Sequence, residues 1–484
     1  MDDSATPNTG STTSDTGGSL AAALDRIGFT RAHAAVVAMV LAGMFFDALE
    51  QDATGAIGGG LNASFGMDTS GIALLNAVTT VGGLVGRLVT GWLADRRGRR
   101  YALSLNLLLY TLGGLLSAVA PNEALLHVSR FIVGVGLGGE FTVGLALLAE
   151  MVATRYRGTV AASLNIGSGG VGNFVAFGLF LLVLGPLNDA LGGTSLSWRW
   201  LFVLLAVPAL LVVVFRRYLP ESPRFLLAQG RIDEANTVLT RLASGRLRGT
   251  PTEITPYLTD ADATTSHRIP FAELTTATSL RRTAAIGLAS WMAFGAQVTL
   301  LVLMPSILVA KGYSITSSLA FTMVMNVGSL LGACASAWLA GRARRKVVVT
   351  TAAVLGCLAA VAFALFAHGA PLILVLGAIF QFFALLLNTT LAAWSPELYP
   401  TRVRALGTSV VNGIGNVSGA VMPLLAVALF AAGGAAAMFL MLAVMYVVLA
   451  VAAVFAPETM GRSLEEINPG DRAPVSRGTS IEPR

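Results

Sequence analysis

Apolar segments long enough to cross a lipid bilayer alternate with short polar connections along most of the chain. A helix needs about 20 mainly apolar residues to span the hydrocarbon core of a membrane. Segments of roughly this length begin near Ala34, Ile72, Ala102, Ala124, Thr159, Trp198, Ala284, Thr316, Val347, Pro371, Arg404 and Ala435. This pattern predicts an all-α membrane protein with twelve transmembrane helices.

Positive charge alternates between the connections. Every second connection, on one side of the membrane, is rich in basic residues. These connections hold Arg96 to Arg100, Arg155 with Arg157, Arg216 to Arg282, Arg342 to Lys346, and Arg402 with Arg404. The connections near Asn62, Pro121, Asp189, His368 and Gly433 hold no Arg or Lys, and Lys311 is the exception on that side. Because basic loops stay in the cytoplasm, we expect a multi-pass protein of the plasma (cytoplasmic) membrane with both termini cytoplasmic.

Composition excludes several other classes of protein. Hydrophobic residues make up 55% of the 484 residues and charged residues only 12%, against about a quarter in soluble proteins. The net charge of +6 comes from residues that mark topology, so we expect no nucleic-acid partner. Cys334 and Cys357 lie in apolar segments and offer neither a disulfide framework nor a metal site. The histidines are scattered and no Walker A sequence is present, so the sequence indicates neither an enzyme nor an ATP-driven pump, and no cofactor.

The chain contains an internal duplication. The segment "GRLVTGWLADRRGRR" (86–100) recurs as "GACASAWLAGRARRK" (332–346), and 338 − 92 = 246 for the shared Trp. The segment "AEMVATRYRG" (149–158) recurs as "PELYPTRVRA" (396–405), and 397 − 150 = 247 for the shared Glu. Two parallel six-helix halves, with a binding site between them at the membrane midplane, describe a transporter that works by alternating access.

The duplication sets the expected domain boundaries. We expect a disordered cytoplasmic tail (1–30), a first six-helix half (31–218), a cytoplasmic linker with short amphipathic helices (219–282), a second half (283–457) and a cytoplasmic tail (458–484). In the linker, Ser222 and Pro223 predict a helix start. One chain holds both halves, so we expect a functional monomer in the lipid bilayer.

Acidic residues lie where the first apolar segment nears its end. Asp47 is roughly 20 Å along a helix that starts near Ala34 and shares a face with Glu50. A carboxylate facing lipid costs at least about 2.5–3.5 kcal/mol. The sequence therefore predicts Asp47 and Glu50 as proton-binding groups in a wet cavity, with the alternative that Glu50 is already solvated at the exterior surface.

The fourth apolar segment carries a second charged set. Arg130 and Glu140 share a face but lie about 15 Å apart, so they cannot pair with each other. We expect Arg130 to balance Asp47 or Glu50, and Glu140 either to bind a proton or to make a structural hydrogen bond. Arg87, in the second segment, either extends to the cytoplasmic surface or binds a substrate carboxylate through two hydrogen bonds.

Several motifs together resemble the major facilitator superfamily. "GWLADRRGRR", with Gly91, Asp95, Gly98 and Arg99, is similar to its loop between spans two and three, and "RFIVGVGLGGE" (130–140) to the fourth span of proton-coupled members. "PESPRFLLAQGR" (220–231), "WSPELYPTRVRALG" (394–407) and "PETMGRSLEEI" (457–467) resemble the sugar-porter-like branch, which also includes carriers of organic acids and other metabolites. The second copy departs from the loop motif, because Gly341 replaces Asp95.

The resemblance implies a cytoplasmic gate. Asp95 with its neighbouring arginines would hold the outward-open state, and close helix approach at Gly91 would support it. Two acids have the spacing to form ion pairs that switch partners between states: Glu150 with Arg155 and Arg157, and Glu397 with Arg402 and Arg404. The alternative for these pairs is a static, solvated contact.

The second half is polar without charge inside the membrane. The polar and aromatic residues of its spans are Trp291, Gln297, Asn326, Gln381, Asn388, Trp394, Asn412 and Asn416. Such residues line pockets but also join helices. The resemblance favours Gln297, Asn388, Trp394 and Asn412 as pocket lining, and we include Trp291.

These features predict a secondary active transporter, a symporter that uses the proton gradient to move a small organic solute, most of all an organic or aromatic carboxylate. The aromatic-acid:proton symporters resemble the first span in having two acids three residues apart. The alternatives are a sugar:proton symporter, for which "WMAFGAQVTL" (291–300) has only one Gln, a proton-coupled drug or metabolite exporter, and, in a different class, a receptor or scaffold that does not transport.

Overall fold

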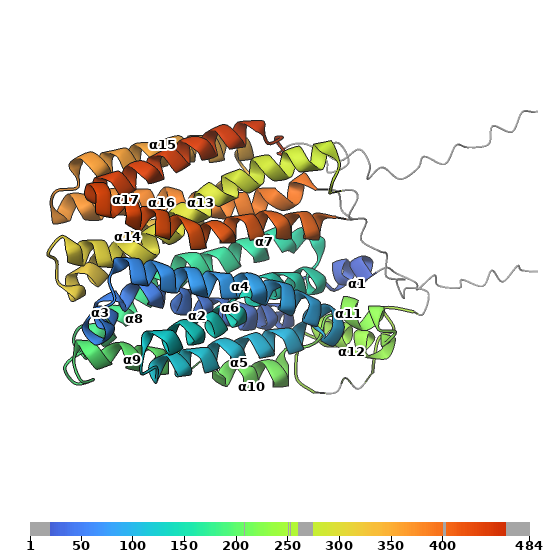
Figure 1. The fold of residues 1–484 in the computed structure, drawn as a ribbon. Coiled ribbons are helices and arrows are strands. Elements are labelled where there is room, and N and C mark those ends of the chain that lie inside the picture. The colour runs from blue at the N-terminus through green and yellow to red at the C-terminus, as the bar shows by residue number, and fades with distance from the viewer. Residues whose placement is uncertain are drawn as a thin grey trace, which may run out of the picture.

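The computed structural model describes residues 20–207, 209–249, 251, 253–259, 274–399 and 403–460. Within these ranges every regular element is a helix (Figure 1). Arg402, which the sequence places in the gate, lies outside the described residues, as do 1–19 and 461–484.

The first half contains six spans. The first four are α2 (Arg31–Ala56), α4 (Thr69–Arg97), α5 (Arg99–Ala118) and α6 (Glu123–Met151), with the short α3 (Gly58–Phe65) after α2. The fifth runs from α7 (Thr154–Asn165) through a π-helical segment, η1 (Ile166–Gly172), into α8 (Asn173–Leu184). The sixth consists of α9 (Thr194–Leu205) and α10 (Ala209–Tyr218).

The second half is built from longer helices. They are α13 (Ala277–Ala310), α14 (Ile315–Leu339), α15 (Arg345–Phe366), α16 (Ala370–Trp394) followed by the 3-10 turn η4 (Ser395–Leu398), and α17 (Arg404–Phe455). Gly433 and Gly434 interrupt the helical geometry of α17 and divide it into two spans. Among the described residues, 10 helices are individually long and apolar enough to cross a membrane. With the division of α17, and with α9 and α10 as one span, these helices supply the twelve predicted spans.

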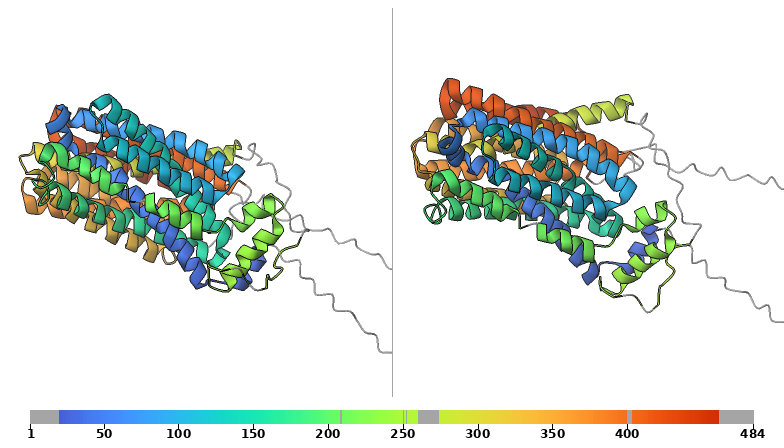
Figure 2. Two further views of the ribbon diagram at one scale, coloured as in Figure 1. Left: turned by 90° about the horizontal axis from the view of Figure 1, so that it is seen from below. Right: turned by 60° about the horizontal axis from the view of Figure 1, so that its bottom comes forward.

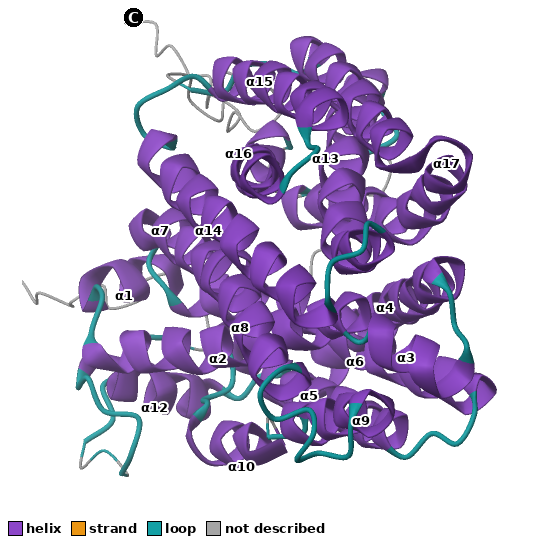
Figure 3. Cartoon of the chain, turned by 90° about the vertical axis from the view of Figure 1, so that its left-hand side faces the viewer, coloured by secondary structure: helices purple, strands orange, loops and turns teal. Residues whose placement is uncertain are grey.

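The two halves lie side by side along a common axis. Figure 1 shows α13 to α17 on one side of the bundle and α2 to α10 on the other, and the end-on view of Figure 3 shows the same division. At one end lie α1 (Leu20–Ile27), α11 (Pro223–Ala228) and α12 (Ile232–Ala243) (Figure 2). We call this the linker end, and the opposite end, where α3 lies, the distal end.

Close helix crossings repeat between the halves. A side chain at Gly82 or Gly86 of α4 would collide with the carbonyl oxygens of Phe131 and Val135 in α6. In the second half, side chains at Gly328 and Gly332 of α14 would collide with the carbonyl oxygens of Ala378 and Phe382 in α16. Since 328 − 82 = 246 and 378 − 131 = 247, these crossings follow the sequence duplication.

The halves meet most closely toward the distal end. A Cβ at Gly55 of α2 would lie 2.7 Å from the carbonyl oxygen of Val302 in α13, and Asn76 of α4 donates to the carbonyl oxygen of Gly419 in α17 at 2.9 Å. One apolar core extends through both halves. A separate core fills the linker end of the first half beneath α11 and α12. The described contacts therefore close the distal end more tightly than the linker end.

Two segments outside the spans, the linker and residues 20–27, form helices. Ser222 accepts from the N–H of Phe225 at 3.2 Å and caps α11, with Pro223 in its first turn, as the sequence predicts. The helix α1 lies inside the segment for which we expected disorder, because Ala23 and Leu24 are buried there and α1 packs against α12. The expected disorder therefore does not extend over residues 20–27.

Candidate functional site

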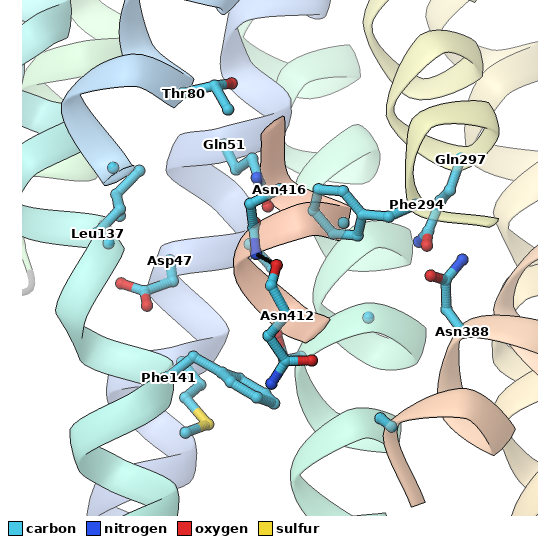
Figure 4. Close-up of a pocket in the computed structure, with 18 of the residues that line it drawn as sticks. Asp47, Gln51, Thr80, Leu137, Phe141, Phe294, Gln297, Asn388, Asn412 and Asn416 are labelled. Carbon is cyan, nitrogen blue, oxygen red and sulfur yellow. Dashed lines mark hydrogen bonds between the residues drawn. The ribbon is translucent and has the colours of Figure 1, made fainter. Parts of the chain in front are cut away.

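A cavity of about 250 Å³ lies between the two halves. The first half lines it with charged and polar residues of α2, α4 and α6, including Asp47, Gln51 and Arg87. The second half lines it from α13, α16 and α17, with Gln297, Asn388 and Asn412 (Figure 4). Five predicted residues that are distant in the sequence, Asp47, Arg87, Gln297, Asn388 and Asn412, are thus brought together around one space.

The cavity wall from the second half offers side-chain amides. The side-chain N–H groups of Asn388 donate to the carbonyl oxygens of Ala384 at 2.9 Å and Ala293 at 3.2 Å. Asn416 donates to the backbone oxygen of Asn412 at 2.6 Å. Figure 4 shows the polar ends of Gln297 and Asn388 directed toward each other. These amides are held in place by the helices while facing the cavity, as specificity groups do.

Aromatic side chains line the cavity from both halves. Phe141 comes from α6 and Phe294 from α13, and Figure 4 shows them with Asn412 and Asn416 nearby. A planar ring placed among such side chains gains stacking contacts in addition to burial. The cavity therefore combines an aromatic lining with polar groups.

Arg87 is the basic group of the cavity wall. Its Nε donates to the carbonyl oxygen of Gly138 in α6 at 3.1 Å. Within the described part of the chain, no carboxylate lies within salt-bridge distance of its guanidinium. The sequence left two expectations for Arg87, and the structure agrees with the one that has its side chain at the cavity rather than extended to the cytoplasmic surface. Its remaining N–H groups can therefore receive a carboxylate.

Glu50 forms a fully buried ion pair with Arg130. The same guanidinium donates to the backbone oxygen of Glu50 and to Thr54 Oγ1, both at 3.1 Å, and lies 5.2 Å from the ring centre of Phe202. Glu50 is only 1% exposed, so it is not solvated at the surface. Arg130 pairs with Glu50 and not with Asp47.

Glu140 and Asp47 have no such partner. Glu140 is fully buried on α6, and its carboxylate lies against Gly43 of α2, where even a methyl group would collide with Oε1. Among the described residues, the two carboxylate oxygens of Glu140 have no hydrogen-bond partner, and Oδ1 of Asp47 has none either. No structural hydrogen bond accounts for Glu140. Because an unpaired buried charge is costly, both acids have the environment of groups that bind a proton.

Two predicted lining residues lie elsewhere. Trp394 is fully buried in the apolar core near η4, and Trp291 is absent from the lining although Ser290 and Phe294 of the same helix contribute. Both predictions about the cavity are wrong for the same reason: a residue is rotated by about 100° from its neighbour on a helix, so its sequence position does not define the face it occupies.

Other lining residues were not predicted. Gln51 follows Asp47 by four residues, so the one-turn spacing identifies it as lying on the same face. Ser168 and Gly169 come from the π-helical segment η1, whose glycine-rich sequence "IGSGGVG" was the available signal. Phe141 directly follows Glu140 and was passed over as an ordinary apolar residue.

The linker end of the first half is held by a network around Arg99. Its guanidinium lies 3.1 Å from Asp95 and 3.1 Å from Glu150, and its backbone N–H donates to Glu221 at 2.8 Å. Gly98 precedes it with φ +97°, and a side chain there would collide with Glu221. This contact explains why Gly is required at position 98. Glu221 was missed because its partner is 122 residues away.

The second half repeats this network. Arg345 lies 3.2 Å from Glu397, and the backbone N–H groups of Arg345 and Lys346 donate to Glu458 at 3.1 and 3.0 Å. Glu458 follows Pro457 in the segment "PET" (457–459), and Glu221 follows Pro220 in the matching segment "PES" (220–222). Each carboxylate therefore caps the first turn of an equivalent helix, α15 or α5.

These two caps differ electrostatically. Burial raises the pKa of Glu221, although N–H groups of Ser222, Arg99 and Arg100 and the charge of Arg99 oppose it. Burial also acts to raise the pKa of Glu458, but the N–H groups of Met460, Lys346, Arg345 and Thr459 together lower it below the ordinary 4.5.

Some gate expectations need correction. Glu150 pairs with Arg99, whereas Arg157 donates to the carbonyl oxygen of Val152 at 3.3 Å and Arg155 stacks on the ring of Tyr156. In the second half Glu397 pairs with Arg345. The pairing of Glu397 with Arg402 and Arg404 stays a prediction, because Arg402 and the side chain of Arg404 lie outside the described part. Gly91 has open space where a side chain would lie, so it does not mediate a close helix crossing.

Comparison with known proteins gives one consistent result. The sequence profile of the sugar (and other) transporter family matches residues 27–470. The niacin transporter NiaP of Acinetobacter baylyi is 28% identical over 452 residues, covering 93% of this chain and 99% of that protein. The inner membrane metabolite transport protein YgcS of Escherichia coli is 27% identical over 399 residues, covering 80% of this chain and 82% of that protein. The solved structure of the proton:xylose symporter XylE, bound to 6-bromo-6-deoxy-D-glucose, has a TM-score of 0.69 at 18% identity and covers 91% of this chain and 100% of that chain, which shows the shared fold.

Proposed function

Because the chain belongs to the sugar (and other) transporter family of the major facilitator superfamily, it is a multi-pass transporter of small metabolites and not an enzyme, and we propose that it carries an aromatic carboxylate together with protons. One observation carries this proposal: Arg87, without a carboxylate partner in the described residues, shares a cavity with the unpartnered acid Asp47. A basic group for the solute and an acid for the proton thus lie in one space.

The cavity walls define the proposed solute. Arg87 would bind the carboxylate through two charge-assisted hydrogen bonds. Phe141 and Phe294 would pack on a ring, and Gln297, Asn388 and Asn412 would hydrogen-bond a ring nitrogen or hydroxyl. A volume of about 250 Å³ is below the usual range for drug-sized ligands and favours a single-ring compound. A relative that is a niacin transporter supports a nicotinate-like acid.

The proton would be bound by the acids of the first half. With the solute carboxylate on Arg87, protons on both Asp47 and Glu140 would leave no unpaired charge on these groups when the cavity closes, which lowers the cost of moving the solute through the membrane. Without these protons, closure leaves buried negative charge. This difference couples the two fluxes.

The contacts at the two ends support an inward-facing state. We propose that the basic linker end faces the cytoplasm, as the positive-inside rule indicates, so that the closed distal end faces outward. The ion pairs of Arg99 and Arg345 stay within their own halves here and would exchange partners when the linker end closes. One chain contains the whole cavity, so a monomer suffices.

Uptake into proteoliposomes tests this function. The purified protein would be offered labelled nicotinate, benzoate, a hexose and a cationic dye, with and without an inward proton gradient. We expect one of the two acids to accumulate, and only with the gradient. Hexose accumulation would instead support the sugar symporter that the amide-rich wall of the second half allows. Dye expulsion, or binding without accumulation, would overturn the proposal in favour of an exporter or a receptor.

A further inference from the structure

Three acids stand at successive levels along the inside of the first half. On α2, Gly43 touches Glu140, Asp47 follows one turn later, and Glu50 is bound by Arg130 toward the distal end. Seven residues of helix separate the levels of Glu140 and Glu50, which is about 10 Å. A proton moves directly only between groups about 2.6–3.2 Å apart, or through one water. Transfer between Glu140 and Glu50 therefore needs intermediate groups. Asp47 is one of them on α2, and the neighbouring helix α5 offers a second.

Tyr110 of α5 lies at this intermediate level. Its backbone packs against Gly136 of α6, where a Cβ would lie 2.5 Å from the Tyr110 nitrogen and 2.8 Å from its Cβ. Gly136 is one turn from Glu140. In the distal direction, Gly114 is one turn from Tyr110, and a Cβ there would lie 3.8 Å from Oε1 of Glu50. The tyrosine thus stands one turn from the level of each acid.

The hydroxyl group of Tyr110 has no assigned role in the fold. Tyr110 is 1% exposed, and its Oη has no hydrogen-bond partner among the described residues. Buried hydroxyl groups are nearly always hydrogen-bonded, so an orphan hydroxyl requires an explanation. The charges of Asp47, Glu140 and Glu50 all act on it, which places it within electrostatic reach of the three acids.

The surroundings of Tyr110 contain few other charged groups. From α2 the charges of Asp47 and Glu50 act on it, and from α6 that of Glu140, while Arg130 of α6 is paired with Glu50. On α4, which also packs against α5, Arg87 is engaged with Gly138 at the cavity. On α9, Arg199 donates to the carbonyl oxygen of Ala118 at the distal end.

On α10, Arg217 and Tyr218 lie at the linker end, and Arg217 is exposed. The side chain of Arg216 is outside the described part. Of the described groups on these helices, the three acids are those whose charges act on the tyrosine.

We propose that Tyr110 is a proton relay that joins the distal acid Glu50 to Asp47 and Glu140, along a path inside the first half that reaches the solute cavity only at Asp47. The inference rests on the proposed proton coupling and extends it to a residue of α5, a helix that contributes nothing to the described cavity lining.

The relay step conserves atoms and charge. Because no acid oxygen lies within hydrogen-bond distance of Oη among the described residues, each transfer would pass through one bridging water. When Glu50 is protonated from the distal side, its O–H bond breaks and the bridging water takes this proton while giving one of its own to Tyr110 Oη. The original phenolic O–H breaks at the same time, and a second bridging water takes its proton while giving one of its own to the carboxylate of Asp47 or Glu140. Tyrosine ends neutral, Glu50 returns to its pair with Arg130, and no other reactant is needed.

The test compares two tyrosines that lose the same atom. Tyr110→Phe keeps the ring and removes the hydroxyl. Tyr446→Phe is the matched control, because Tyr446 is also fully buried, its Oη likewise has no partner in the described structure, and it stacks on Phe380 in the second half. Full-length proteins in proteoliposomes would be assayed for gradient-driven uptake of the transported acid, for solute counterflow, and for proton influx with a trapped pH dye.

The expected result is a split between these readouts. Tyr110→Phe should lose gradient-driven accumulation and solute-linked proton influx while counterflow stays at the wild-type rate, and Tyr446→Phe should keep all three. Wild-type coupling in Tyr110→Phe would overturn the relay. Equal loss of counterflow and coupling in Tyr110→Phe would mean a packing role and would also overturn it. If the wild-type protein itself moves no protons, the proposed function fails first, and the two failures are thereby distinguished.

Discussion

Equivalent positions of the two halves carry different chemistry on one scaffold. Arg87 in α4 corresponds to Ala333 in α14, since 87 + 246 = 333, and Glu140 in α6 corresponds to Leu387 in α16, since 140 + 247 = 387. Arg130 corresponds in the same way to Gly377. Ala333 and Leu387 are fully buried. The charged groups of the first half are therefore replaced by apolar packing in the second.

The packing between these helices is nevertheless the same. Glycines at positions 82 and 86, and at 328 and 332, bring the helices together at matching points, and equivalent arginines and acids hold the linker ends. Buried charge is costly even when it is paired. Under the proposed function, its restriction to one half would divide the work: the first half would bind the protons and, through Arg87, the solute carboxylate, and the second half would shape the rest of the solute site.

Breaking the buried ion pair should have the largest effect. Arg130→Met leaves Glu50 as an unpaired buried charge and should lower the free energy of unfolding by about 3–5 kcal/mol. Thermal unfolding in detergent would measure this loss. Glu50→Met combined with Arg130→Met should recover most of the stability but no gradient-driven transport. A single variant as stable as the wild type would contradict the role of the pair.

Removing the proton site should abolish coupling without unfolding the protein. Glu140→Gln keeps the shape of the side chain but cannot bind and release a proton. Accumulation should fall to its level without a gradient, while counterflow remains. Glu123→Gln is the matched control, because Glu123 is an exposed acid at the start of the same helix. Undiminished accumulation in Glu140→Gln would contradict the assignment of the proton to this acid.

Substitutions in the two cavity walls should raise KM by different amounts. Arg87→Lys keeps the charge but loses the two-point contact, so KM for the acid should rise roughly 10- to 100-fold, the equivalent of about 1.5–3 kcal/mol for a charge-assisted hydrogen bond. Asn412→Leu removes a neutral hydrogen bond and should raise KM about 2- to 10-fold. Equal effects, measured from initial rates of uptake, would remove the distinction between the walls.

The smallest expected effect is a difference in how the stabilisation by Glu221 and by Glu458 depends on pH. The pKa of Glu458 is lowered, so its stabilisation is present above the ordinary value of 4.5 and is lost as pH falls below it. The pKa of Glu221 is raised, so its ionisation weakens the fold as pH rises above 4.5. As pH falls from 7 to 4.5, the Tm advantage of the wild type over Glu221→Gln should grow, and as pH falls below 4.5, its advantage over Glu458→Gln should shrink. Parallel pH profiles would contradict this difference.

Much of the fold could be predicted from the sequence, because apolar segment length and charge alternation report directly on membrane crossing. The duplication was visible as a constant offset, and its physical basis, the crossing glycines, lay within the aligned segments. The break at Gly433 and Gly434 was also predictable, since one span cannot exceed the bilayer thickness.

The site was predictable only in part, since helix rotation and long-range pairing are set by the fold. Asp47, Arg87, Gln297, Asn388 and Asn412 line the cavity as expected, whereas Trp394 faces the core. The pairing of Glu150 with Arg99 joins different helices, and local spacing pointed instead to Arg155 and Arg157. Tyr110 looks like an ordinary core residue in the sequence, because its unpartnered hydroxyl becomes visible only in the fold.

The most direct test of the division of work is solute-induced proton flux. Purified protein in liposomes with a trapped pH dye and no imposed gradient would receive a pulse of nicotinate or benzoate outside, with a permeant ion to prevent a membrane potential. The account predicts acidification of the interior that requires the acid solute, disappears in Glu140→Gln and persists with reduced solute affinity in Asn412→Leu. Solute entry at the wild-type rate with no change in internal pH would contradict it.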